Sequence, residues 1–276
     1  MNQTTPSVAT RLANRAVVRI AGEGVRDFLQ GLVTNDMNAL AAGRPLWAAL
    51  LSAQGKVLFD FILWADGDDV LIDCEADRAQ DLVRRLTLYR LRRPITLAVD
   101  GALGVHWAAQ ETDAGDNAAD DPRLATLGRR WIGAPQGDAA DGAYHARRMA
   151  LGVPEGAAEL GVDKTLWLEA DAVELNGVSF TKGCYVGQEN TARMHHRDKL
   201  RRRLLPVTLD GDPGDTGELR TADGKAAGEL RAHIGGRGMA WLRMELADGP
   251  LSAGDTQARV AWPAWLERGS ESTDAG

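Results

Sequence analysis

The stretch RAVVRIAGEGVRDFLQGLVTND, from Arg15 to Asp36, decides the fold class. Residues 15–22 are rich in β-branched and small apolar side chains, which is typical of a β-strand. Beyond the glycines, apolar residues recur at spacings of three and one, the pattern of one face of a helix: Val25, Phe28, Leu29, Leu32 and Val33. A strand followed directly by an amphipathic helix predicts that an α+β unit begins at Arg15.

The next segments extend this unit. LWAALLSAQGKVLFDFILWAD (46–66) has two apolar runs around the loop 52–55, which predicts a β-hairpin. Residues 69–75 read as a strand, 76–91 as a helix that ends before Pro94, and 95–99 as a further strand. The order of elements predicts a ferredoxin-like unit over residues 15–99, with one extra strand.

The rest of the chain divides into two parts. Short strands at 104–109 and 130–133 flank the acidic segment 111–123, which we interpret as an exposed loop. After Arg203, short alternating stretches separated by Asp-Gly and Gly-Gly turns predict a small antiparallel β-barrel. We therefore expect a composite α+β body over 1–198, a barrel over 199–266, and disordered tails at the first ten residues and at 267–276.

Composition limits the class of protein. The 276 residues are 44% hydrophobic and 26% charged, which is ordinary for a globular protein. No segment has the roughly 18 consecutive apolar residues of a membrane helix, and the start of the chain lacks a targeting pattern. Two cysteines are too few for a disulfide framework. We expect a cytoplasmic monomer without direct membrane contact.

Charge is distributed unevenly along the chain. The formal net charge of −7 disfavours strong nucleic-acid binding. The segment RMHHRDKLRRR, Arg193 to Arg203, nevertheless carries six Lys or Arg against one Asp. This basic run predicts a local anion site, and the alternative is a solvated face beside a strand.

Cys184 lies in TKGCYVGQEN (181–190), between two glycines and ahead of a Gln-Glu pair. A reactive thiol needs nearby cations or a helix N-terminus and some exposure. The alternative is a small apolar side chain packed in a turn. An iron–sulfur cluster held by this chain alone is excluded by counting, because such clusters usually need four cysteines, or two with two histidines. His195 and His196 do not give a zinc spacing with Cys184 either, so no metal ligand is assigned.

Asp60 stands in the apolar run VLFDFILW. Strand alternation places it on one face with Leu58 and Ile62. A carboxylate in such a run is either paired with a donor or used in a pocket, and the alternative is a hydrated strand end.

Taken together, several segments resemble one family. KGCYVGQE and the NTAR that follows it are similar to the K-G-C-Y-x-G-Q-E signature of the YgfZ folate-binding proteins, which are related to the glycine-cleavage T-protein, an aminomethyltransferase, and support iron–sulfur enzymes. FLQGLVTNDM, QGKVLFDF, LYRLRRP and GMAWLR resemble further segments of that family. The likeness covers most of residues 12–265, and its cysteine motif is the most specific part.

The resemblance implies a T-protein-like architecture around a central channel that holds a reduced folate such as tetrahydrofolate. It implies an accessory role in assembly or repair of iron–sulfur proteins, including tRNA-modifying enzymes, with iron–sulfur enzymes or assembly factors as partners. The alternative is a folate-dependent aminomethyltransferase or demethylase, so whether the protein is an enzyme stays open. Cys184 and Asp60 are the candidate catalytic residues, and the candidate folate-binding residues are Asp60, Lys182, Tyr185, Gln188, Glu189 and Arg193.

Two departures from the T-protein pattern bear on transfer chemistry. Asp60 matches the second acid of the T-protein G-G-I-L-D-D motif, but Phe59 replaces the first. Ala150 stands where a pterin-binding glutamate is expected. Lys182, Arg193 and the run Arg201 to Arg203 are expected to attract the folate tail and to lower the pKa of the Cys184 thiol.

Overall fold

The computed structural model describes residues 8–196 and 200–267. Its first unit is a five-stranded sheet in the order β3-β4-β5-β2-β6. The unit comprises β2 (Arg15–Gly22), α1 (Val25–Gln30), β3 (Leu46–Leu51), β4 (Val57–Asp66), β5 (Asp69–Glu75), α2 (Ala79–Arg90) and β6 (Ile95–Val99). Without the edge strand β3, this is the ferredoxin-like order, so the predicted unit with one extra strand is confirmed. Apolar residues of α1 and α2 form one core with the sheet face they cover.

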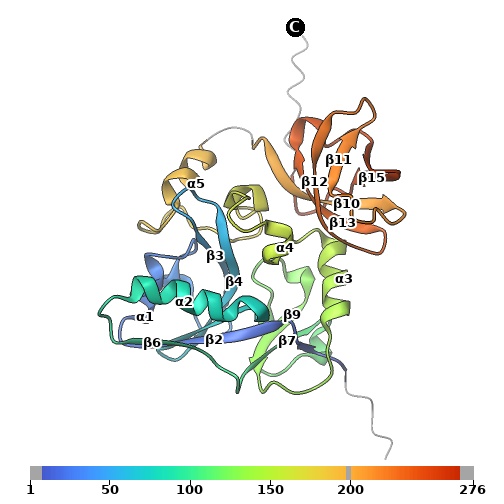
Figure 1. The fold of residues 1–276 in the computed structure, drawn as a ribbon. Coiled ribbons are helices and arrows are strands. Elements are labelled where there is room, and N and C mark those ends of the chain that lie inside the picture. Colours follow the sequence, from blue (N-terminus) through green and yellow to red (C-terminus); the bar gives the residue numbers. More distant parts are fainter. Residues whose placement is uncertain (1–7, 197–199, 268–276) are drawn as a thin grey trace, which may run out of the picture.

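A second, four-stranded sheet stands beside the first (Figure 1), in the order β1-β7-β9-β8. It comprises β1 (Arg11–Leu12), β7 (Gly104–Ala108), β8 (Ala119–Asp120) and β9 (Arg129–Gly133). The helices α3 (Asp141–Leu151), α4 (Gly156–Leu160) and α5 (Gln188–His195) follow. The largest apolar core joins the two sheets with α3 and with residues 167–185. Short 3₁₀ turns are η1 (Met37–Ala39), η2 (Ala76–Arg78), η3 (Glu111–Asp113), η4 (Ala125–Leu127), η5 (Trp167–Ala170) and η6 (Met244–Leu246).

The acidic segment 111–123 is not simply an exposed loop, and this prediction is corrected at its C-terminal end. Residues 119–120 form β8, and Asp121 and Arg123 are both buried. The Arg123 guanidinium binds both carboxylate oxygens of Asp121, at 2.9 and 2.7 Å. Composition cannot distinguish these two charges from solvated ones, because the groups that bury them, such as Glu155 and Tyr144, lie elsewhere in the chain.

The C-terminal part is a closed antiparallel barrel with the strand order β10-β13-β12-β11-β14-β15. Its strands are β10 (Arg202–Asp210), β11 (Glu218–Thr221), β12 (Ala226–Ile234), β13 (Arg237–Arg243), β14 (Leu251–Ala253) and β15 (Thr256–Val260). Figure 1 shows the barrel at one end of the molecule, next to α3 and α4. The predicted α+β body with a C-terminal barrel is therefore confirmed.

Some predictions fall at or beyond the limits of the described chain. The boundary expected between residues 198 and 199, and nearly all of both predicted tails, lie outside the described residues. Thr10, which falls in the predicted N-terminal tail, is described, and its hydroxyl lies 3.2 Å from Nδ1 of His106. Within residues 8–196 and 200–267, no helix has the length and apolar character needed to cross a bilayer.

Candidate functional site

The cysteine motif forms a turn between η5 and α5, and Cys184 is exposed on it. The neighbouring Gly183 has open space where a Cβ would stand, so no packing covers that side of the turn. Cys74, by contrast, is buried in β5. Both cysteines of the sequence lie in the described part, and Cys184 is thus the accessible thiol. The packed-turn alternative for Cys184 is not favoured by this exposure.

One end of this turn is fixed by Lys182, which is buried although it is a lysine. Its Nζ donates to the carbonyl oxygens of Val33 at 2.5 Å and Asn35 at 2.9 Å. The ammonium also lies 4.9 Å from the ring centre of Tyr185, another buried member of the motif. Lys182 therefore ties the turn to the segment after α1, and its charge is engaged there.

The other end of the turn is fixed at the tip of the β3–β4 hairpin. Gly187 adopts φ +85°, and a Cβ there would lie 2.6 Å from the carbonyl oxygen of Ser52. Asn190 adds a hydrogen bond from Nδ2 to the Gln54 carbonyl oxygen, at 2.8 Å. Only glycine permits both this backbone conformation and this close approach. Cys184 is consequently presented on a short turn that is anchored on both sides.

The remaining predicted residues of the motif lie on α5. Gln188 is half-buried at its first turn, whereas Glu189 and Arg193 are exposed. The Arg193 guanidinium donates to Oδ1 of Asn190 at 2.6 Å. Gln188, Glu189 and Arg193 thus lie together on α5, the helix that follows the turn of Cys184.

Several described members of the basic run are engaged with other parts of the protein. Arg203 donates to the carboxylates of Asp171 and Glu174, the latter at 2.6 Å. Arg202 stacks over the ring of Trp241, 4.1 Å from its centre. Residues 197–199 lie outside the described residues. Of the cations expected to attract an anion, Lys182, Arg202 and Arg203 already have protein partners.

Asp60 is buried in β4, with 4% of its surface exposed. Its Oδ1 accepts a hydrogen bond from the backbone N–H of Gly156 at 3.1 Å, and its Oδ2 accepts one from Nε1 of Trp47 at 3.3 Å. Burial raises the pKa of Asp60, and the positive charge of Arg15 opposes that rise. Of the three possibilities raised by the sequence, the structure shows a carboxylate paired with donors.

Asp60 lies within the β3–β4 hairpin, some distance along the strand from the tip that the cysteine motif contacts. Gly187 contacts the tip near Leu51, which pairs with Val57, whereas Asp60 pairs with Ala49. The three residue-to-residue steps from Val57 to Asp60 span about 10 Å along a strand. The structure therefore brings Lys182, Tyr185 and Gln188 together with Cys184, but it does not place Asp60 among them.

The surroundings of Asp60 do not fit a pterin ring in this conformation. The crevice beside it is too narrow to admit a sphere the size of a water molecule. Both carboxylate oxygens already accept hydrogen bonds from the protein. Folate binding therefore stays a prediction from the family resemblance.

A buried network of charges beside Asp60 was missed by the sequence reasoning. Asp73 accepts hydrogen bonds from Nε of Arg15 at 2.7 Å and from Nε of Arg130 at 2.6 Å. Glu155 accepts from Nη1 of Arg123 at 2.7 Å and from the Tyr144 hydroxyl at 2.6 Å. These residues come from β2, β5, β9, α3 and two loops, so the network joins the two sheets.

Electrostatics of this network centre on Glu155. Burial alone would raise its pKa, but the guanidinium groups of Arg15, Arg123, Arg130 and Arg148 hold the pKa well below its usual 4.5. Burial also raises the pKa of Tyr144 to about 12, so this hydroxyl stays a donor. The network is thus a set of charged groups that links the two sheets. One available signal was the occurrence of arginine inside apolar segments, such as Arg15 and Arg130.

We predict that Lys182→Met lowers the free energy of unfolding by about 1–3 kcal/mol, because two carbonyl oxygens lose their donor. Burial lowers the pKa of Lys182 from 10.5 to about 8. The cost of burying the ammonium is therefore fully present below about pH 8 and disappears as the pH rises towards 10.5. Urea unfolding should show the advantage of wild type over Lys182→Met growing across this range. Lys164→Met, at an exposed lysine, is the control, and an advantage that shrinks with pH would contradict the assignment.

Comparison with known proteins first defines the class. Residues 201–268 match the C-terminal β-barrel domain of CAF17. The glycine cleavage system aminomethyltransferase T from Bartonella henselae has a similar solved structure, with a TM-score of 0.71 over 95% of this chain and 88% of that chain. At 12% identity this likeness shows the fold alone. The chain is thus a T-protein-like fold that carries a CAF17-type barrel.

Sequence similarity then gives the family. The mitochondrial iron–sulfur cluster assembly factor IBA57 of Mus musculus is 35% identical over 91% of this chain and 81% of its own length. IBA57 of Homo sapiens is also 35% identical, over 87% of this chain and 79% of its own. The chain belongs to the IBA57 family of iron–sulfur cluster assembly factors. The resemblance to YgfZ proteins holds at a coarser level of relationship.

The predicted cytoplasmic location is contradicted. The relatives from Mus musculus, Homo sapiens and Neurospora crassa are all named as mitochondrial proteins. The prediction rested on the absence of a targeting pattern and on the small number of cysteines, and neither observation identifies a compartment.

Proposed function

We propose that this protein assists the assembly of iron–sulfur proteins through the thiolate of Cys184. The observation that carries the proposal is the exposed thiol on a turn anchored by Lys182 and Gly187. Membership of the IBA57 family supports it. The cluster is the cargo: Cys184 loses its proton and supplies one thiolate to iron, and a partner protein supplies the others.

Cys184 cannot share a cluster with the second cysteine of the chain. Cys74 is buried in β5, and its sulfur lies 3.8 Å from the Ala16 carbonyl oxygen. Among the described residues no group of three or more His, Cys, Asp or Glu side chains is arranged to hold a metal ion. Cluster binding through Cys184 is therefore proposed as an intermolecular event. The decisive test is complementation of cells that lack the protein with a Cys184→Ala variant, with iron–sulfur enzyme activity as the readout.

Binding of tetrahydrofolate is a second and separate proposal, supported by the T-protein-like fold and by the family resemblance. Aminomethyl transfer with Asp60 as its acid–base group is the less favoured alternative, since Asp60 is enclosed and Phe59 replaces the first acid of the T-protein pair. Service to tRNA-modifying enzymes and a monomeric state also stay proposals.

A thermal-shift titration with tetrahydrofolate tests whether Asp60 belongs to a folate site. We expect wild type and Asp60→Asn to respond to the ligand by the same change in Tm, because the crevice beside Asp60 does not admit a ring. Each variant is compared with its own ligand-free Tm, so a loss of stability in Asp60→Asn does not affect the result. A saturable rise in wild type that disappears in Asp60→Asn would place folate at Asp60 and contradict the geometry.

A further inference from the structure

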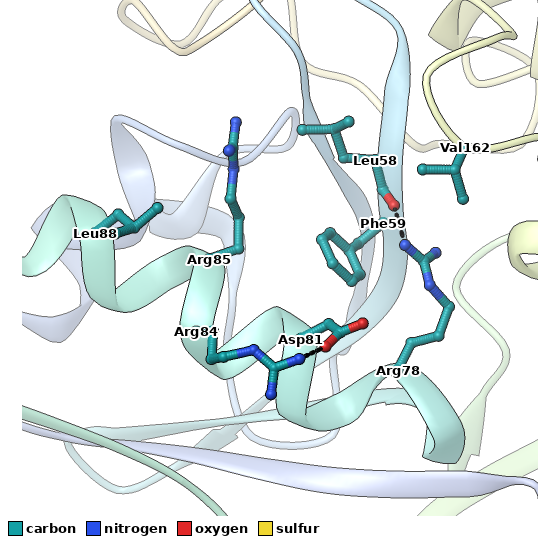
Figure 2. A pocket seen from close by; sticks show the side chains of 8 residues that line it. All are labelled: Leu58, Phe59, Arg78, Asp81, Arg84, Arg85, Leu88 and Val162. Atoms are coloured by element: carbon teal, nitrogen blue, oxygen red, sulfur yellow. Dashed lines mark hydrogen bonds and ion pairs between the residues drawn. The ribbon is translucent and has the colours of Figure 1, made fainter.

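A groove between β4 and α2 combines apolar side chains with unpaired positive charge. This α2 groove has a volume of about 390 Å³. Figure 2 shows the ring of Phe59 between the side chains of Arg78 and Arg85, which extend from η2 and α2. The residues that line the groove are Leu58, Phe59, Arg78, Asp81, Arg84, Arg85, Leu88 and Val162.

Apolar side chains on this surface are exposed to an unusual degree. Leu88 is 68% exposed and Val162 is 45% exposed, and both line the groove. Outside the groove lining, Leu91 follows the last residue of α2 and is 82% exposed. Apolar side chains gathered at one place on a surface mark an interaction site more often than single ones do.

The charge of the groove comes mainly from Arg85. Arg84 is neutralised by an ion pair with Asp81, and Arg78 donates to the Leu58 carbonyl oxygen at 3.0 Å. Arg85 has no carboxylate partner within the described chain: its guanidinium lies 5.7 Å from the ring centre of Tyr89, and its Nε is buried without an acceptor. The Arg85 guanidinium is thus a positive charge without an anionic partner among the described residues.

The surrounding segment is basic, although the chain is acidic. Residues 76–94 contain six arginines and two aspartates, whereas the whole chain has a net charge of −7. The open, exposed rim of Leu88 and Val162 suits an extended partner better than a small ligand that must be enclosed. Charge complementarity then requires that the partner be acidic.

We propose that the α2 groove docks an acidic segment of a partner protein, with aliphatic side chains against Phe59 and Leu88 and a carboxylate on Arg85. This docking site is distinct from the thiol of Cys184 and does not depend on cluster chemistry. It provides a second point of contact, at which a partner can bind before the Cys184 thiolate takes part in cluster binding.

Fluorescence anisotropy of the full chain with a labelled peptide tests the proposal. The probe is a fluorescein-labelled heptapeptide with two leucines flanked by glutamates. We expect saturable binding at low salt, weakened about tenfold by Arg85→Glu and about tenfold by Leu88→Ser. A peptide with lysines in place of the glutamates should not bind. Cys184→Ala should bind like wild type, which separates this site from the proposed cluster function.

Matched controls lie on the barrel, where Arg237 and Ile234 are exposed at the turn between β12 and β13. Arg237→Glu and Ile234→Ser should bind the probe within about twofold of wild type. Absence of saturable binding, equal affinity in Arg85→Glu, or equal weakening by Arg237→Glu would each overturn the proposal. Sedimentation of the chain alone tests whether a second copy of the protein occupies the groove. A dimer that dissociates in Arg85→Glu would show this and would also overturn the proposal of an acidic partner.

Discussion

Replacing Glu155 by glutamine is expected to lower the free energy of unfolding by about 3–5 kcal/mol, the range found when one partner of a buried ion network is removed. Glutamine keeps the shape of the side chain but removes its charge. Arg15, Arg123, Arg130 and Arg148 then surround a neutral group inside the protein. Arg123 also loses the charge-assisted quality of its 2.7 Å hydrogen bond to Oε2. Urea unfolding followed by circular dichroism measures the loss.

A matched control is Glu111→Gln, which removes a carboxylate that is 84% exposed and 3.8 Å from the Arg129 guanidinium. An exposed pair of this kind contributes about 0–1 kcal/mol, so this variant should unfold nearly like wild type. If Glu155→Gln loses this much free energy of unfolding and Glu111→Gln does not, the buried network stabilises the fold. A loss below about 1 kcal/mol in Glu155→Gln would show that the four arginines find compensation elsewhere.

Acid should remove the stability advantage of wild type over Glu155→Gln. The folded pKa of Glu155 lies well below 4.5, so the unfolded chain takes up a proton from this group first as the pH falls. The stabilisation is present above the ordinary carboxyl pKa and is lost as the pH falls through the folded value. The difference between wild type and Glu155→Gln should therefore shrink below about pH 4.5.

The sequence was informative wherever structure is local. The strand 15–22, the hairpin turn at 52–55 and the helix that ends before Pro94 follow from periodicity and turn residues, and all are present in the structure. Gly183 and Gly187 indicated a tight turn around Cys184, but the residues alone left exposed and packed positions of the thiol open, and the structure shows it exposed.

Long-range pairing was not accessible in the same way. Arg15 and Arg130 meet at Asp73 although they are far apart in the chain, and no spacing rule connects them. Lys182 was expected to offer its charge to a ligand, but it donates to Val33 and Asn35, about 150 residues earlier in the chain. Asp60 could be recognised as unusual in an apolar strand, but whether it is open or enclosed depends on Gly156 and Trp47. These features are set by tertiary contacts, which a single sequence does not display.

Cells that lack this protein and receive Cys184→Ala should fail to recover iron–sulfur enzyme activity, with a loss as large as that of the empty vector. The thiolate is a ligand that alanine cannot replace, and serine should fail as well because its hydroxyl does not ionise at neutral pH. Folding should be unaffected, since Cys184 is exposed and lies next to the open turn at Gly183. Equal Tm values for Cys184→Ala and wild type would therefore assign the loss to chemistry.

Cys74→Ala is the control within the same chain, and it should show the opposite pattern. Its side chain packs in the core between the sheet and the helices, so its truncation should lower the stability by about 1–2 kcal/mol while the enzymes recover. If the protein acts instead as a transferase, the variants should rank differently: Asp60→Asn should abolish the recovery of iron–sulfur enzyme activity, and Cys184→Ala should retain it. Full recovery with Cys184→Ala would show that the anchored turn serves as a scaffold only. Loss with Cys184→Ala and recovery with Cys74→Ala would leave the exposed thiol as the group that acts on the cluster.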